Sequence, residues 1–158
     1  MPDTFRAVFR EATPADAVAV VALHREFANY LRALGDTSEF RLDEKGFCRD
    51  GFGVTRGFST IVAESDETIV GYAMYHPGYD SDRAMRVVHV IDLYVALEAR
   101  RRGVGRGLID AVSAAARELG AAELQWAVFE PNALAFDFYA ALGAVPMRGL
   151  RYMRLDAR

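Results

Sequence analysis

Apolar and polar residues along the first fifty positions change from an alternating pattern to a helical one. Residues 5–10 are expected to form the first strand. The sequence TPAD at 13–16 then opens a helix, because threonine caps an N-terminus, proline fits the first helical position and an acid suits the first turn. Gly35 ends this helix. A second, short helix is expected over residues 43–50, and residues 51–53 follow as a loop.

The middle of the chain is rich in β-branched and aromatic residues, which favours strands. Residues 58–64 and 68–76 are predicted to form a hairpin joined across 65–67. Residues 77–82 contain a Pro-Gly pair and are predicted to form a loop. The run Met85–Val95, with the sequence MRVVHVIDLYV, is predicted to be a long and largely buried strand.

The last third of the chain alternates helical and strand patterns. A helix is expected over residues 105–119, and a strand over residues 122–129. Asn132 caps a further helix that runs to residue 142, where a glycine follows. Two short strands, 145–148 and 152–155, complete the chain.

The predicted element order, β-α-α-β-β-β-α-β-α-β-β, defines an α/β fold of the α+β kind. A strand–helix–strand order around residues 89–129 implies one parallel pair inside an otherwise antiparallel sheet. The chain has 158 residues, so we expect a single domain that spans residues 1–158.

Composition excludes several classes of protein. A formal net charge of −3 does not favour nucleic acid as a partner, and the single cysteine, Cys48, forbids an intrachain disulfide. His24, His76 and His89 lack the spacing of metal ligands, so we expect isolated histidines at surface or strand positions and no metal. No segment approaches the ~18 apolar residues of a membrane span, and residues 1–11 lack the apolar region of a secretory signal. We therefore expect a cytoplasmic protein with no membrane partner.

The most informative segment is the glycine-rich turn at residues 100–107, RRRGVGRG. Glycines at a helix start let the backbone approach a ligand, and the free N–H groups of the first helical turn favour an anion there. A pyrophosphate fits this description, and the arginines add positive charge for other phosphates.

This turn has three other interpretations. A solvated basic loop would have the same arginines. A dinucleotide fold requires G-x-G-x-x-G directly at a strand end, whereas here the third glycine falls one residue early and seven residues separate Val95 from Gly103. A P-loop is excluded because no Gly-Lys-Ser/Thr follows.

The pattern Arg100-x-x-Gly103-x-Gly105 resembles the pyrophosphate-binding signature of the GNAT superfamily of N-acetyltransferases. Residues 127–144, a strand end followed by Asn132 and a Phe-Tyr pair on a helix, resemble the second signature of that family. The resemblance extends to the spermidine/spermine (diamine) acetyltransferases and their thialysine-acetylating relatives, through residues 25–30 (REFANY), 50–53 (DGFG) and 70–75 (VGYAMY).

The resemblance implies a GNAT fold, acetyl-CoA as cosubstrate and a homodimer. It implies that the main chain of Leu93, Tyr94 and Val95 holds the acetyl group and the pantetheine arm. It makes Tyr139 the general acid, against an alternative in which Tyr139 packs beside an apolar stripe of the helix. The other implied cofactor-binding residues are Arg100, Arg101, Arg102, Gly103, Val104, Gly105, Arg106, Gly107, Leu108, Asn132, Ala135 and Phe138.

The sequence departs from the diamine branch where a base is expected. That branch has Glu-Asp on the central strand, and this chain has Ile91-Asp92; a second family acid is replaced by Leu31. Asp92 is therefore the candidate base, against a purely structural hydrogen-bonding role.

Further candidates contact the amine substrate, against an interpretation of the acids as surface charges. They are Glu26, Tyr30 and Glu130. The expected reaction is acetylation of a small primary amine: a polyamine, a diamine or a lysine-like amino acid. The alternatives are acetylation of a protein N-terminus or another amine, and a non-catalytic sensor that only binds CoA.

Overall fold

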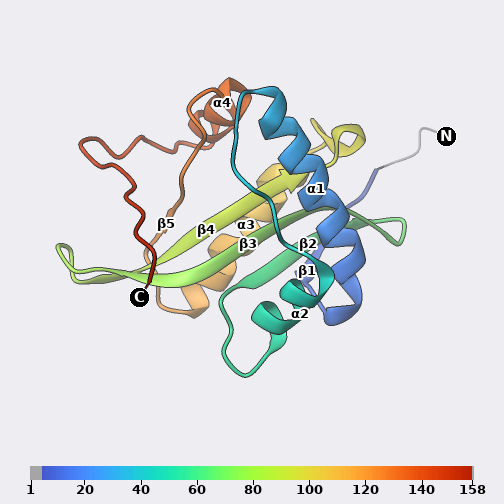
Figure 1. Ribbon diagram of the computed structural model, residues 1–158, viewed down its shortest axis with the longest axis horizontal. Helices are drawn as coiled ribbons and strands as arrows, with labels where there is room; N and C mark the ends of the chain where they lie inside the picture. Colours follow the sequence, from blue (N-terminus) through green and yellow to red (C-terminus); the bar gives the residue numbers. More distant parts are fainter. Residues whose placement is uncertain (1–4, 158) are drawn as a thin grey trace.

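The chain folds around one mixed sheet with helices on both faces (Figure 1). The computed structural model describes residues 5–157. The strand order is β1-β2-β3-β4-β5, with antiparallel neighbours except for the parallel pair β4 and β5, as the sequence predicts. The strands are β1 (Val8–Glu11), β2 (Ser59–Ser65), β3 (Thr68–Asp80), β4 (Met85–Val95) and β5 (Glu123–Gln125). The helices are η1 (Pro14–Asp16), α1 (Ala17–Ala33), α2 (Glu44–Phe52), η2 (Leu97–Ala99), α3 (Val104–Glu118) and α4 (Ala133–Ala141).

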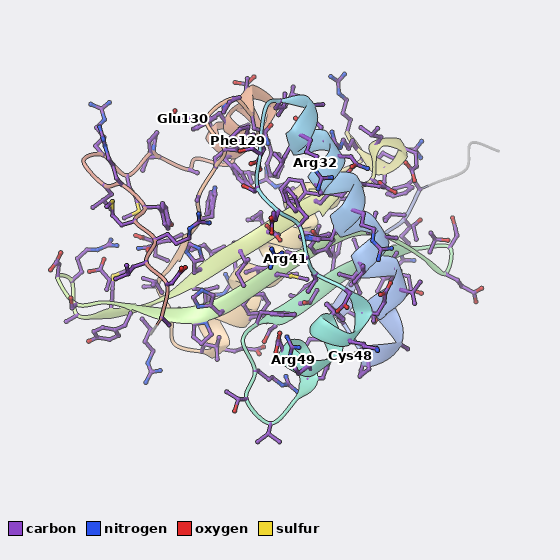
Figure 2. All side chains as sticks on the ribbon, viewed as in Figure 1. Arg32, Arg41, Cys48, Arg49, Phe129 and Glu130 are labelled. Carbon is purple, nitrogen blue, oxygen red and sulfur yellow. The ribbon has the colours of Figure 1, made fainter. Side chains whose placement is uncertain are left out.

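Two apolar layers hold the helices to the sheet. Helix α3 lies behind the sheet in Figure 1 and buries one side chain every four residues, from Val104 through Leu108 and Val112 to Ala116. Helices α1 and α2 cover the opposite face, where Phe47 of α2 is fully buried. A loop of residues 34–43 joins these two helices and crosses in front of the sheet; Arg41 marks it in Figure 2.

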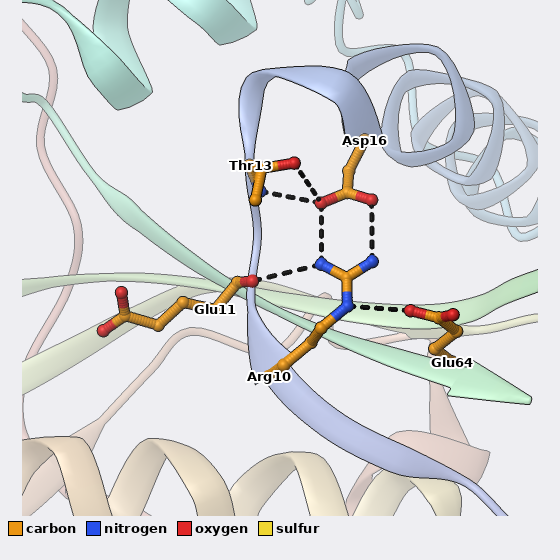
Figure 3. A network of polar contacts seen from close by, with 5 residues as sticks. All are labelled: Arg10, Glu11, Thr13, Asp16 and Glu64. Carbon is orange, nitrogen blue, oxygen red and sulfur yellow. Dashed lines mark hydrogen bonds and ion pairs between the residues drawn. The ribbon is translucent and has the colours of Figure 1, made fainter. Parts of the chain in front are cut away.

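The start of α1 is fixed by an ion-pair network that Figure 3 shows. Both terminal nitrogens of Arg10 donate to the Asp16 carboxylate at 2.9 Å, and its Nε donates to Glu64 at 2.7 Å. The Thr13 backbone N–H also donates to Asp16, at 2.7 Å. The guanidinium of Arg10 and these hydrogen bonds hold the pKa of Asp16 at about 2. The network joins β1, β2 and α1, so it orients the helix that forms one wall of the site.

Two predicted loops are shorter than expected. Of residues 77–82, only 81 and 82 lie in a turn, because β3 continues to Asp80 in register with β4. Strand β2 begins opposite Tyr75, so beyond that residue β3 has a free edge, where a proline without an N–H is tolerated. Residues 51 and 52 belong to α2. Glycine at position 51 leaves room for the Phe58 ring, because a Cβ on Gly51 would lie 2.9 Å from that ring.

Strands predicted near the C-terminus are shorter or not formed. Strand β5 has only three residues where 122–129 was expected, and residues 145–148 and 152–155 form no strand. Their alternating pattern is typical of a half-buried strand, but within residues 5–157 no strand pairs with them. Apolar side chains there are exposed, namely Val145, Met147, Leu150, Tyr152, Met153 and Leu155.

Candidate active site

A cleft opens where β4 and β5 separate. The two strands pair only at Val87–His89 with Glu123–Gln125, and the chain after β5 then rises away from β4 beside α4, where Figure 2 labels Phe129 and Glu130. The edge of β4 that faces this gap keeps backbone groups outside the sheet ladder. The cleft has a volume of about 280 Å³. Its walls come from α1, the 34–43 loop, β4, the segment after β5 and α4, through Phe27, Leu31, Asp36, Ser38, Phe40, Val90, Ile91, Asp92, Leu93, Trp126, Ala127, Val128, Phe129, Asn132, Ala135 and Tyr139.

A β-bulge in β4 lies at this cleft. Met74 of β3 pairs with Asp92 and the next residue, Tyr75, pairs with Val90, so Ile91 has no partner. Ile91 is 41 % exposed in an otherwise largely buried strand. A bulge bends a strand and redirects its side chains, which is common beside active sites. The bulge sets Asp92 and Leu93 against the cleft.

Asp92 lies in a buried polar group with His24 of α1 and Tyr72 of β3. Its Oδ2 is 3.5 Å from Nδ1 of His24, and the same nitrogen is 3.0 Å from the Tyr72 hydroxyl. Burial raises the pKa of Asp92 and lowers the pKa of His24, while each partner's charge opposes these changes. Asp92 is therefore a carboxylate of raised basicity at the cleft. The expectation of an isolated, surface or strand His24 is wrong, since this helical histidine is 8 % exposed.

Tyr139 approaches the cleft from the opposite side. Asn132 caps α4 by accepting from the Ala135 N–H at 3.3 Å, and the Tyr139 ring packs on Trp126 with centroids 4.7 Å apart. Burial, with a smaller contribution from the charge of Asp92, raises the pKa of Tyr139 to about 12. The phenol therefore stays protonated at neutral pH and can donate a proton into the cleft. Of the apolar stripe on α4, Leu134 is 63 % exposed, whereas Phe138 and Leu142 are half-buried.

Asn132 and Tyr30 join α4 to α1. The Tyr30 hydroxyl donates to Asn132 Oδ1 at 2.9 Å, so this amide oxygen serves both the cap and the inter-helix bond. Arg100 lies over this contact: its guanidinium is 5.2 Å from the ring centroids of both Tyr30 and Tyr94. Its Nε also donates to the Val95 carbonyl at 2.9 Å. Arg100 thus holds the end of β4, rather than acting as a mobile charge.

The N-terminus of α3 is built as an anion site. Gly103 has φ +82°, a conformation that L side chains rarely adopt, and Arg101 has φ +60°. The helix ladder begins with the bond from the Gly107 N–H to the Gly103 carbonyl, which leaves the N–H groups of residues 104–106 directed outward along the helix axis. This arrangement fits a pyrophosphate such as that of CoA. Arg101, Arg102 and Arg106 are exposed around it.

The glycines of this turn have different structural reasons. A Cβ on Gly105 would lie 3.1 Å from the ring of Phe138, so Gly105 lets α4 pack on the start of α3. A Cβ on Gly107 would overlap the Phe9 ring of β1. Val104 and Leu108 are core residues, 2 % and 0 % exposed. Only Gly103 has open space beside it, as a close backbone approach to a ligand requires.

Sequence reasoning missed part of the cleft and chose two acids outside it. Glu26 and Glu130 are exposed and neither lines the cleft; the Glu26 carboxylate accepts from the Tyr94 hydroxyl at 3.4 Å. The 34–43 loop contributes Asp36, Ser38 and Phe40, which carry no motif. The one sequence feature that could have indicated this wall of the cleft is a carboxylate, Asp36, in a short polar loop after a helix.

Within residues 5–157 two kinds of feature are absent, a cluster of metal-ligating side chains and a membrane-spanning helix. In this part of the chain, histidine, cysteine and acidic side chains nowhere gather in threes as a metal site would need. None of its helices combines the length and the apolar character needed to cross a membrane.

Splayed parallel strands, a bulged central strand and a helix start with free N–H groups are the features expected of an acyl-CoA-binding fold. Residues 20–144 match the Acetyltransferase (GNAT) family, so the chain belongs to that family. The thialysine N-epsilon-acetyltransferase of Bos taurus is 32% identical over 145 residues, which cover 87% of this chain and 83% of that protein. These matches confirm the resemblance inferred from the sequence.

One further relative and one solved structure are similar to this chain. The L-ornithine N5-acetyltransferase NATA1 of Arabidopsis thaliana is 31% identical over 91 residues, 58% of this chain and 40% of that protein. The solved structure of aminoglycoside N-acetyltransferase AAC(6')-Iy in complex with CoA superposes with a TM-score of 0.79 over 99% of each chain, at 17% identity. That similarity shows the fold alone. Family membership makes the chain an acetyl-CoA-dependent N-acetyltransferase.

Proposed function

We propose that this chain, as a single catalytic domain, acetylates the terminal amine of a small lysine-like amino acid, with Asp92 as base and Tyr139 as acid. The observation that carries the proposal is the pairing of a buried carboxylate on β4 with a protonated phenol on α4 across one cleft. Relatives named for thialysine and ornithine support this substrate class.

The cleft walls favour an acceptor with few positive charges. Leu31 and Ile91 present apolar side chains where a polyamine enzyme of this family would carry acids. An unpaired ammonium beside them would lose hydration without compensation. Asp36 is the carboxylate on the loop side of the cleft, and hydrogen bonds from Ser38 lower its pKa, so it stays charged. One free ammonium can be matched there, whereas the several charges of a spermidine cannot.

Each group of residues has a separate role in the proposed acetyl transfer. Acetyl-CoA supplies the activated acetyl thioester. The start of α3, with Gly103 and the exposed arginines, binds its phosphates, and the free edge of β4 at Leu93–Val95 aligns the thioester through backbone groups. Asp92 accepts a proton from the acceptor ammonium, directly or through one water. Tyr139 holds a proton for the departing thiolate, and Asn132 keeps α4 in position.

The test is an acetyl-CoA-dependent thiol-release assay against thialysine, lysine, ornithine, spermidine and an aminoglycoside. We expect the ratio of kcat/KM for spermidine to thialysine to be below one. A ratio above about 10, which corresponds to ~1.4 kcal/mol of transition-state discrimination, would contradict the substrate class. Tight CoA binding with no turnover of any amine would instead support the non-catalytic sensor.

We further propose that the protein is a homodimer. The exposed apolar side chains of residues 145–155, together with Leu134 of α4, are in contact with solvent in a single copy of the chain. A second copy would cover this apolar surface. Light scattering coupled to size-exclusion chromatography measures the mass directly. A mass near twice 17.5 kDa is expected, and a monomer at micromolar concentration would contradict the proposal.

A further inference from the structure

His24 is a buried ionisable side chain on the sheet-facing side of α1. It is 8 % exposed and neighbours fully buried apolar residues one turn earlier, Val20 and Val21. The Phe40 ring, 5.6 Å away, covers it from the 34–43 loop. A polar group in such a place costs stability unless it is hydrogen-bonded, and a titratable one calls for a specific reason.

One nitrogen of His24 faces two oxygens from two different strands. Nδ1 lies 3.0 Å from the Tyr72 hydroxyl and 3.5 Å from Asp92 Oδ2. In the neutral ring with its proton on Nε2, Nδ1 accepts from the Tyr72 hydroxyl. Once Nδ1 carries a proton, the same atom can donate toward Asp92. The geometry therefore allows two arrangements that differ by one proton on one atom.

We propose that His24 is a positioning residue for Asp92, and that it shares the proton that Asp92 takes from the acceptor ammonium. This inference rests on the proposed function, because it assumes that Asp92 is the base. It assigns to α1 a part in catalysis that none of the sequence motifs indicates.

The proton balance is simple. An acceptor R–NH3+ transfers one proton to Asp92, and its nitrogen becomes neutral with a free electron pair. The Asp92–His24 pair goes from a net charge of −1 to 0, whichever of the two holds the proton. A carboxylate–imidazolium pair in a desolvated site retains a favourable charge interaction, so the pair holds the proton better than a lone buried carboxylate does. The pair then returns the proton to water in the cleft.

The groups around this pair come from every neighbouring element. Tyr72 on β3, Tyr94 on β4 and Tyr139 on α4 have pKa values raised by burial, so they remain neutral between pH 5 and 9. Glu26 of α1 contacts the outer side of Tyr94. Asp36 of the loop has a lowered pKa and remains charged. The Asp92–His24 pair is thus the part of this cluster in which one proton can be held on either of two facing atoms, 3.5 Å apart.

The experiment compares His24→Leu, His24→Gln and a control, His76→Gln, which removes a histidine of β3 that does not line the cleft. The readout is the pH dependence of kcat/KM with the best acceptor from the amine panel. For His24→Leu we expect at least a tenfold lower kcat with an unchanged KM for acetyl-CoA. The rising limb should also move to lower pH, because a lone Asp92 carboxylate holds the proton less well than the Asp92–His24 pair does.

His24→Gln keeps a side-chain amide near Asp92, and we expect it to recover part of the rate. His76→Gln should match the unmodified chain. A folded His24→Leu protein with a rate within twofold of the unmodified chain and an unmoved limb would overturn the proposal.

A second measurement needs no turnover and covers a His24 variant that fails to fold. The imidazole of His24 is titrated by NMR in the unmodified chain and in Asp92→Asn. The charge of Asp92 raises the pKa of His24, so its midpoint should fall in Asp92→Asn. Equal midpoints in the two proteins would overturn the inference. If no amine is turned over, the proposed function fails, but this titration still decides whether the two groups share a proton.

Discussion

Tyr139→Phe removes one oxygen atom from the wall of the cleft and leaves the aromatic ring in place. The ring keeps its packing on Trp126, at 4.7 Å between centroids, and on Phe138, at 5.0 Å. No hydrogen bond to the Tyr139 hydroxyl holds the fold together among the described residues. We therefore expect the free energy of unfolding to change by less than about 1 kcal/mol. Any large kinetic effect would then be chemical.

The size of that effect follows from the state of the phenol. With a pKa of about 12, roughly one molecule in 10,000 has lost the Tyr139 proton at pH 8. General acid catalysis typically contributes ~100- to 10,000-fold. We expect kcat to fall at least tenfold in Tyr139→Phe, with little change in the KM for acetyl-CoA. In the unmodified chain, deprotonation of Tyr139 should cause no loss of rate between pH 8 and 10, because this range lies well below that pKa.

The assay is thiol release under single-turnover conditions, so that chemistry rather than product release is measured. Tyr79→Phe is the matched control, since Tyr79 is 65 % exposed on β3 and does not line the cleft. If Tyr139→Phe stayed within twofold of the unmodified chain while chemistry limited the rate, Tyr139 would have only a packing role.

Three further changes have expected outcomes. Asp16→Asn should be less stable than the unmodified chain at pH 7. The pKa of Asp16 is about 2 in the folded chain and 3.8 when unfolded, so its carboxylate contributes about 2 kcal/mol of stability above pH 4, which is lost as the pH falls toward 2. Urea denaturation across this pH range should show that loss only with Asp16 present. Gly105→Val places a branched side chain against Phe138, so α4 should shift and the KM for acetyl-CoA should rise at least tenfold in steady-state kinetics. The double change Leu31→Glu with Ile91→Glu should move the kcat/KM ratio toward spermidine, and an unmoved ratio would mean that the acceptor lies elsewhere.

Much of the frame could be predicted from local patterns. Strand β4 has the predicted bounds, Met85–Val95, because its run of β-branched and aromatic residues is unbroken. Asn132 caps α4 and Gly35 follows α1 with a positive φ, as expected for residues whose conformational roles are encoded locally. The parallel pair followed from the order of elements alone.

The remaining features depend on contacts between segments that are distant in the sequence. His24 belongs with Asp92 and Tyr72 only once α1 is laid across β3 and β4, and no spacing along the chain records that. The 34–43 loop forms a wall of the cleft because of the path it takes across the sheet, and its amino-acid composition does not indicate that path. Residues 152–155 have a strand pattern but pair with none of the described strands, although the Tyr152 ring lies 6.5 Å from that of His89 in β4. Pairing requires backbone hydrogen bonds to a partner, which a pattern cannot supply.

The central claim is that the Asp92 carboxylate accepts the proton of a small amino-acid amine. The most direct test is kcat/KM of Asp92→Asn with thialysine, measured against pH beside the unmodified chain, with calorimetry of CoA binding to both. The account predicts at least a hundredfold lower kcat/KM, loss of the rising limb and unchanged CoA affinity. A folded Asp92→Asn protein that retains the rate and the limb of the unmodified chain would contradict it.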